Sequence, residues 1–212
     1  MNLKSLIKRA LAPVLAVSLV GCANSEPVTD EQTAILQFEM EEIVIEPEVQ
    51  VVALDVVPPK YKYELPGASI QEQMALRAFQ DRGITDRLAL ATLMGNLKQE
   101  SLFKADICEG GARVPYEQCL RGGYGLIQWT TANRYRGLGE FCEKYDCNPS
   151  TTEGQLRYLF NEYQWVRSEH IFKTPGKSIE WYMENGAYPW LGWGIHGERT
   201  NYAYDYARWL SS

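Results

Sequence analysis

The chain has 212 residues, of which 45% are hydrophobic and 23% are charged, and its formal net charge is −6. This size and composition predict one folded domain with a sizeable core, together with an additional segment. The charge is uneven: residues 1–22 hold three basic residues, residues 23–59 hold nine acidic and no basic residues, and residues 60–212 hold 18 of each sign. Because the largest part is neutral, we expect no nucleic-acid partner.

The first 22 residues have the pattern of an export signal. Lys4, Lys8 and Arg9 precede an apolar run at residues 11–20, which is too short to cross a bilayer comfortably as a helix. The run ends in LVGC, residues 19–22, which resembles the lipobox of bacterial lipoproteins, where Cys22 receives the lipid. We therefore expect a protein of the cell envelope, anchored by lipid in the periplasm. The alternative is a virion component or a phage-encoded secreted protein.

Residues 23–65 are expected to form an acidic linker of low order between this signal and the folded domain, residues 66–212. The linker is acidic and contains two consecutive prolines, which suits an extended tether. Residues 42–57, EIVIEPEVQVVALDVV, are rich in valine and isoleucine. Pairing of this stretch as a strand therefore stays open.

Helical patterns dominate the remainder of the chain. Residues 69–83 open with Ser69 and Glu72 at the spacing of a capping box and stop at Gly83. A second helix is predicted after Thr85 and ends near Ser101. Further helices are predicted within residues 150–170, 178–185 and 199–210, and no segment alternates like a long strand. The fold class is therefore mainly α.

Four cysteines follow Cys22, all within residues 108–147. Export favours their oxidation, and three pairings are possible. Short loops favour one disulfide between Cys108 and Cys119 and another between Cys142 and Cys147.

A metal site is not favoured, because His170 and His196 are the only histidines and neither has a standard spacing from a cysteine pair. We expect no metal and no cofactor. A cysteine peptidase or amidase that uses Cys108 or Cys142 with a histidine is a less favoured function, and intact disulfides would exclude it.

Two segments carry the functional signal. NLKQESLF, residues 96–103, ends the second helix with Glu100 and Ser101, and RGGYGLIQWT, residues 121–130, follows a glycine-rich loop. They resemble the catalytic ES helix end and the GLMQ loop of lytic transglycosylases, in the lysozyme-like superfamily. The closer resemblance is to the phage tail lysozyme family, in which GYGLIQW precedes an arginine-containing turn, here residues 133–136, and an EGQL helix start, here residues 153–156. The resemblance covers residues 85–165 and fades beyond them.

The resemblance implies a single lysozyme-like domain, mainly α with α+β character, that binds peptidoglycan glycan strands in a groove. The implied activity is that of a muramidase or a lytic transglycosylase, which cleaves the bond between MurNAc and GlcNAc. Glu100 would be the general acid that protonates the leaving oxygen. We expect the protein to act as a monomer.

The same resemblance suggests residues that contact the substrate. Ser101 would bind near the sugar or anchor the loop, and Tyr188 matches a family tyrosine only loosely. The remaining candidates come from the glycine-rich loop: Gly125, Leu126 and Gln128.

Aromatic residues are frequent near the C-terminus. Tyr202, Tyr206 and Trp209 have helical spacing, so we expect them in the core. Trp190 and Trp193 are compatible with either a saccharide-binding rim or the core.

The second carboxylate is not identified by any motif. Hydrolases ordinarily use two carboxyl groups, whereas a lytic transglycosylase works with one. Asp106, Glu109 and Glu117 lie between the two motifs. The main alternative function is an inactive saccharide-binding envelope or virion protein of the same fold, which a salt bridge at Glu100 would favour.

Overall fold

The computed structural model describes residues 60–192 and 197–212. Cys22, the possible strand at residues 42–57 and most of the expected linker lie outside these ranges. The helices are α1 (Ile70–Asp81), α2 (Arg87–Ser101), α3 (Ala132–Tyr145), α4 (Thr152–Leu159), α5 (Tyr163–Phe172), α6 (Ile179–Tyr182), α7 (Tyr188–Leu191) and α8 (Arg199–Trp209). A 3-10 turn, Tyr116–Gln118, lies between α2 and α3, and a π-helical turn, Met183–Ala187, joins α6 to α7.

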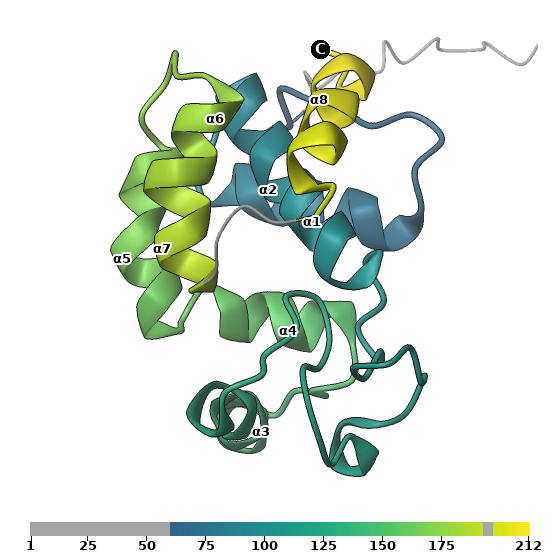
Figure 1. Ribbon diagram of the computed structural model, residues 1–212. Helices are drawn as coiled ribbons and strands as arrows, with labels where there is room; N and C mark the ends of the chain where they lie inside the picture. The colour runs from purple at the N-terminus through teal and green to yellow at the C-terminus, as the bar shows by residue number, and fades with distance from the viewer. Residues whose placement is uncertain (1–59, 193–196) are drawn as a thin grey trace, which may run out of the picture. The chain divides into compact units, whose positions relative to one another are not determined.

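These residues form a single, mainly helical domain. In Figure 1, α3 and the long loop after α2 lie below α4, whereas α1, α2 and α5–α8 lie above it. Within the described ranges the only β pairing consists of isolated bridges, such as the one between Cys108 and Tyr124. The mainly α fold class is confirmed.

Helix α1 begins where its predicted capping box places it, and α2 begins after Thr85, as expected. The Ser69 hydroxyl accepts a hydrogen bond from the backbone N–H of Glu72 at 3.2 Å, and the Glu72 carboxylate accepts one from the Ser69 N–H at 2.9 Å. This is the expected capping box of α1. At α2, the Asp86 carboxylate accepts from the N–H groups of Leu88 and Ala89.

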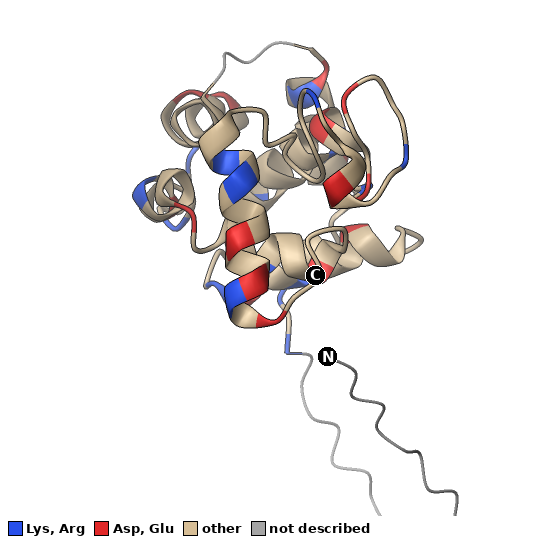
Figure 2. Ribbon diagram, turned by 90° about the horizontal axis from the view of Figure 1, so that it is seen from below, with Lys and Arg blue, Asp and Glu red and all other residues tan. Residues whose placement is uncertain are grey.

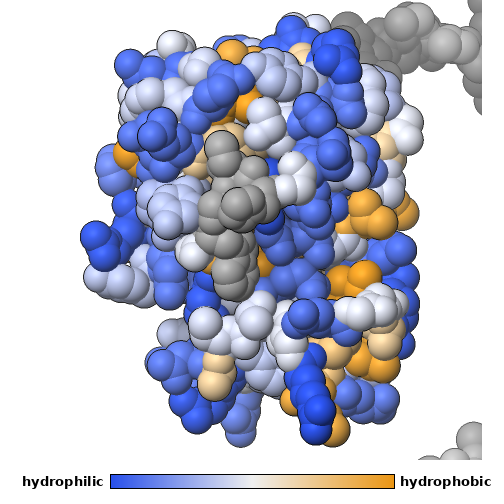
Figure 3. Space-filling model, in the orientation of Figure 1, coloured by the Kyte–Doolittle hydropathy of each residue, from blue (hydrophilic) through white to orange (hydrophobic). Residues whose placement is uncertain are grey.

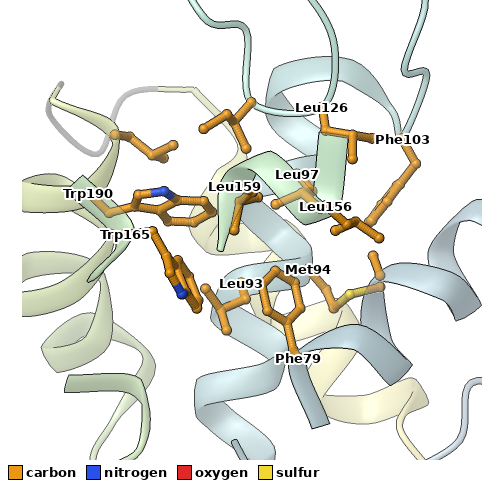
Figure 4. Packing of buried hydrophobic residues seen from close by; sticks show 14 of the residues in the cluster. Phe79, Leu93, Met94, Leu97, Phe103, Leu126, Leu156, Leu159, Trp165 and Trp190 are labelled. Atoms are coloured by element: carbon orange, nitrogen blue, oxygen red, sulfur yellow. The ribbon is translucent and has the colours of Figure 1, made fainter. Parts of the chain in front are cut away.

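Helix α2 is the centre of the domain. Every residue from Ala89 to Leu97 is buried, because α1, α6 and α8 pack around it. Figure 4 shows Leu93, Met94 and Leu97 of this helix among aromatic and aliphatic side chains from other segments. Trp129, from the second motif, is fully buried in this core. The expected core position of Tyr206 is confirmed, whereas Trp209 is 48% exposed, so its expected burial was wrong.

Helix α3 was missed from the sequence, and the arginine-containing turn expected at residues 133–136 is its first turn. Two glycines near its middle obscure the helical pattern, since glycine costs about 1 kcal/mol in a helix. Both have a packing role. A Cβ on Gly137 would lie 2.4 Å from the Tyr158 hydroxyl, and one on Gly139 would lie 2.6 Å from the Tyr116 hydroxyl. The glycines therefore let two tyrosines pack on the helix.

The C-terminus pairs with the segment that precedes α1. Glu64 and Ser211 exchange backbone hydrogen bonds of 2.9 and 3.0 Å. Leu65 is buried, and the Tyr63 N–H donates to the Gln80 side chain at 2.9 Å. Folded structure therefore begins before residue 66.

The two predicted disulfides are confirmed. Cys108 is bonded to Cys119, and Cys142 is bonded to Cys147. The first closes the loop between α2 and α3, and the second ties the end of α3 to the residues that follow it.

Charged residues of both signs are distributed over the surface. Figure 2 shows blue and red segments along the helices and loops, consistent with equal numbers of acidic and basic residues from 60 onward. No helix within residues 60–192 and 197–212 is long and apolar enough to span a bilayer.

One ion pair fastens the end of α1 to α5. The Arg82 guanidinium donates two hydrogen bonds of 2.8 Å to the two carboxylate oxygens of Glu169, and Lys173 lies 3.0 Å from the same group. Partial burial alone would raise the pKa of Glu169, but the hydrogen bonds from Arg82 and Lys173 outweigh it and lower this pKa below its ordinary value of 4.5.

We predict that Glu169→Gln lowers the free energy of unfolding by about 1 kcal/mol at pH 7. Because the folded-state pKa is lowered, the stabilisation is present above pH 4.5 and disappears as the pH falls below it. Urea unfolding of both proteins between pH 3 and 7 measures the difference. Glu184→Gln, at an exposed position, is the control. If the difference in unfolding free energy between the wild type and Glu169→Gln does not change with pH, the lowered pKa of Glu169 is contradicted.

Candidate active site

Glu100 lies in the last turn of α2 and is paired with an arginine from α8. The Arg199 Nη1 atom donates to Glu100 Oε1 at 2.6 Å, and both side chains are only 9% exposed. The same Nη1 atom donates to Asn96 Oδ1 at 3.1 Å. A buried guanidinium thus bridges two polar side chains that are one helical turn apart on α2.

Each charge of this pair lies at the less favourable end of its helix. Glu100 lies at the C-terminal, negative pole of α2, and Arg199 at the N-terminal, positive pole of α8. Each placement costs about 0.3–1 kcal/mol on an exposed helix. Contact between the two opposite charges offsets this cost.

A glycine inside α2 makes this contact possible. A Cβ on Gly95 would lie 2.6 Å from the backbone nitrogen of Ala203 and 2.7 Å from the carbonyl oxygen of Arg199. Only glycine lets the two backbones approach so closely. The sequence reasoning missed Arg199, although a basic residue at a helix start and a glycine within an apolar helix were available signals.

The loop of residues 121–130 is held in place at Leu126. Its N–H donates to Gln155 Oε1 at 2.8 Å, and its carbonyl oxygen accepts from the Ser101 hydroxyl at 3.0 Å. Ser101, next to Glu100, is buried, and its single hydroxyl proton is shared between this oxygen and the Leu97 carbonyl oxygen, which lies 3.2 Å away. Of the two expected uses of Ser101, this geometry corresponds to anchoring of the loop.

Gln155 in α4 is the second anchor and is fully buried. Its Nε2 atom donates to the carbonyl oxygens of Ala105 at 2.6 Å and Pro149 at 2.7 Å. Gly125 lies directly against it, since a Cβ there would be 2.3 Å from Gln155 Oε1, and its φ is +71°. Gly125 is therefore required for a close contact within the protein itself.

The model of the phage tail lysozyme family matches residues 71–206, well over half of the chain. The chain belongs to the phage tail lysozyme family. A comparison with curated proteins found no match. Membership supports a lysozyme-like function in peptidoglycan degradation in general, and it agrees with the resemblance that the two motifs indicated.

The arginine and tryptophan positions of the phage tail lysozyme pattern form one buried network. Arg134 Nη2 and Nε donate to the two carboxylate oxygens of Glu162 at 2.7 and 3.0 Å. The indole N–H groups of Trp129 and Trp190 donate to the same carboxylate at 3.2 and 3.3 Å. This network joins the loop to α3, α5 and α7. Trp190 therefore belongs to the core.

Gln128 lies at the end of the glycine-rich loop, partly exposed. Its Nε2 atom donates to the carbonyl oxygens of Gly125 at 3.0 Å and Ile107 at 3.4 Å, so the side chain folds back on its own loop. Its φ is +51°, as is that of Leu102, and that of Phe103 is +60°. Left-handed backbone at non-glycine residues is strained and is often found at functional sites.

The three acidic residues between the motifs differ in their surroundings. Asp106 is paired with Arg113. The Glu109 carboxylate accepts from the Gly123 N–H at 3.0 Å, and Glu117 is exposed in the 3-10 turn.

The remaining expected site residues are Tyr188, which is 52% exposed at the start of α7, and Trp193, which lies outside the described residues. The four cysteines after Cys22 are oxidised, so they provide no thiolate, and the structure argues against a cysteine peptidase or amidase. Among the residues described, no three His, Cys, Asp or Glu side chains are grouped so as to hold a metal ion.

We predict that Gly125→Ala lowers the free energy of unfolding by about 2–4 kcal/mol, from the left-handed backbone and the contact with Gln155. Gly176→Ala is the matched control, because Gly176 has a φ of +76° and nothing within 4 Å of its Cβ position. The control should lose only about 1 kcal/mol. If urea unfolding shows the same loss of free energy for Gly125→Ala and Gly176→Ala, the contact between Gly125 and Gln155 does not restrict the residue at position 125.

Proposed function

We propose that this protein cleaves the glycosidic bond between MurNAc and GlcNAc in peptidoglycan, with Glu100 as the general acid. The observation that carries the proposal is the position of Glu100, a mostly buried carboxyl group at the end of α2, next to the serine that anchors the family's glycine-rich loop. Acids that protonate a leaving oxygen are typically held in such water-poor positions.

Proton donation requires the Glu100–Arg199 pair to open. The Asn96 amide oxygen is a second acceptor for the same guanidinium nitrogen. Arg199 therefore keeps a buried partner when Glu100 carries a proton and turns toward a sugar oxygen. Asn96 and Arg199 are positioning residues in this mechanism, since they act on Glu100 and not on the substrate.

The ion pair also favours a second function, a saccharide-binding protein without turnover. In the structure the Glu100 carboxyl group contacts Arg199 and is mostly buried, so it is not presented to a sugar oxygen. In that case the anchored loop and Tyr188 would contact glycan strands, and Glu100 would be structural.

We predict that Glu100→Gln reduces the release of glycan fragments from cell-wall sacculi by about 10²- to 10⁴-fold. Glutamine keeps an acceptor oxygen for Arg199 but has no acidic proton, so the variant should fold normally. Release of dye-labelled fragments measures the activity, and thermal unfolding checks the fold. The exposed Glu143→Gln on α3 is the charge-matched control.

The outcomes separate the two functions. Fragment release by Glu100→Gln at the wild-type rate would remove Glu100 from the mechanism. Binding of sacculi by the wild type without any fragment release would establish the binding protein. Mass spectrometry of the products then identifies the nucleophile, because anhydro ends indicate a lytic transglycosylase and reducing ends indicate a hydrolase. Asp106→Asn, Glu109→Gln and Glu117→Gln test the second carboxylate.

We also propose that residues 1–22 are a lipoprotein signal and that Cys22 carries the lipid. The 37 residues from 23 to 59 would then tether the domain. A flexible chain of this length has an end-to-end distance of about 30–37 Å, and its acidic residues extend it further by mutual repulsion. That reach would bring a membrane-anchored domain to the peptidoglycan layer.

The test is fractionation of cells that produce Cys22→Ser beside the wild type. The variant should move from the membrane fraction to the soluble envelope fraction. Identical partitioning of the two proteins would contradict a lipid anchor and favour attachment in a virion.

A further inference from the structure

A cleft of about 620 Å³ lies on the α1 and α4 side of the loop that follows Glu100. Its walls come from three places: the start of α1, the residues directly after α2, and the start of α4 with the residues before it. Figure 1 shows these segments on the right of the view, and on that side the surface in Figure 3 combines apolar and hydrophilic residues. The lining residues used below are Met74, Leu102, Lys104, Asp106, Arg113 and Glu153.

We infer that this cleft binds the peptide that branches from the muramic acid units of peptidoglycan. The inference rests on the proposed function for the position of the glycan strand beside Glu100. It adds a binding site for a second chemical class, a short peptide that carries carboxylate and ammonium groups together with small apolar side chains.

Unpaired charges in the cleft match such a peptide. Within residues 60–192 and 197–212, neither the Lys104 ammonium nor the Glu153 carboxylate has an ion-pair partner, although both line the cleft. One is available for a peptide carboxylate and the other for a peptide amine. The adjacent pair of Asp106 and Arg113 offers the same two charges.

The apolar part of the cleft matches the small side chains of the peptide. Leu102 is 54% exposed and has left-handed backbone, with a φ of +51°. This backbone is the left-handed C-cap that ends α2, and it places the Leu102 side chain at the edge of the cleft. Together with Met74 it supplies an apolar surface between the charged groups.

The distances allow one substrate molecule to reach both sites. Leu102 is two residues from Glu100, and an extended chain spans at most about 3.3–3.6 Å per residue, so the cleft begins within roughly 7 Å of the Glu100 backbone. A peptide of four residues extends about 13–14 Å. A muramic acid held beside Glu100 can therefore place its peptide in the cleft.

The test compares two substrates with the full chain: sacculi that carry their peptides, and glycan strands from which the peptides have been removed. We expect Lys104→Gln and Glu153→Gln each to lower kcat/KM on the first substrate by about three- to fivefold, the upper part of the range of exposed charge interactions. Neither should change kcat/KM on the second by more than about twofold. Lys144→Gln and Glu143→Gln on α3 are the matched controls and should match the wild type on both.

Equal losses on both substrates would show that the cleft contacts the glycan, and no loss on either would show that it binds neither. Both results overturn the inference. Failure of the proposed function is recognised separately, as absence of product from either substrate with the wild type. Calorimetric binding of a disaccharide with and without its peptide then decides. The inference is supported if the wild type binds the disaccharide with its peptide more tightly than the disaccharide alone, and if this difference is lost in Lys104→Gln and in Glu153→Gln. It is overturned if the wild type binds both forms equally.

Discussion

The domain depends on how one peptide segment, at Leu126, is held from both sides. Its N–H is bound by Gln155 of α4 and its carbonyl oxygen by Ser101 of α2, while its side chain is buried in the core with Leu97, as Figure 4 shows. Buried peptide groups without partners are costly, so this loop is stable only where both anchors are present. The anchor on α2 is the residue next to Glu100. The position of the loop and the position of the carboxyl group are therefore set by the same contact.

The ion pair of Glu100 and Arg199 is a second constraint, and it depends on backbone packing. The close approach of α8 to Gly95 fixes the start of α8 opposite the end of α2. Two charges that are each unfavourable toward their own helix become favourable toward each other. Loss of either charge removes a charge-assisted contact from a buried site, which is usually more costly than the pair itself. For this reason the isosteric glutamine, which keeps a partner for Arg199, separates chemistry from stability better than alanine does.

Much of the fold could be predicted from local signals. The capping box of α1 and the short cysteine loops act over a few residues, and both predictions were confirmed. Helix α3 was missed because Gly137 and Gly139 lower its helical propensity. The tyrosines that pack against these glycines, Tyr158 and Tyr116, lie outside the helix and about twenty residues away in the sequence, so no local pattern reveals the packing. The Glu100–Arg199 contact joins residues 99 positions apart. No local pattern contains that information.

Non-glycine residues with left-handed backbone are concentrated in the two motifs. Four non-glycine residues with positive φ occur in the described ranges, and three of them, Leu102, Phe103 and Gln128, lie in the two family motifs. Such backbone persists only where neighbouring contacts over-determine it. Here those contacts are the hydrogen bonds of Ser101 and Gln155 and the burial of Phe103. Part of each motif therefore serves to hold left-handed backbone in place. Glu100 lies directly before the turn at Leu102 and Phe103, and the proposed peptide cleft is lined by this turn and the residues after it.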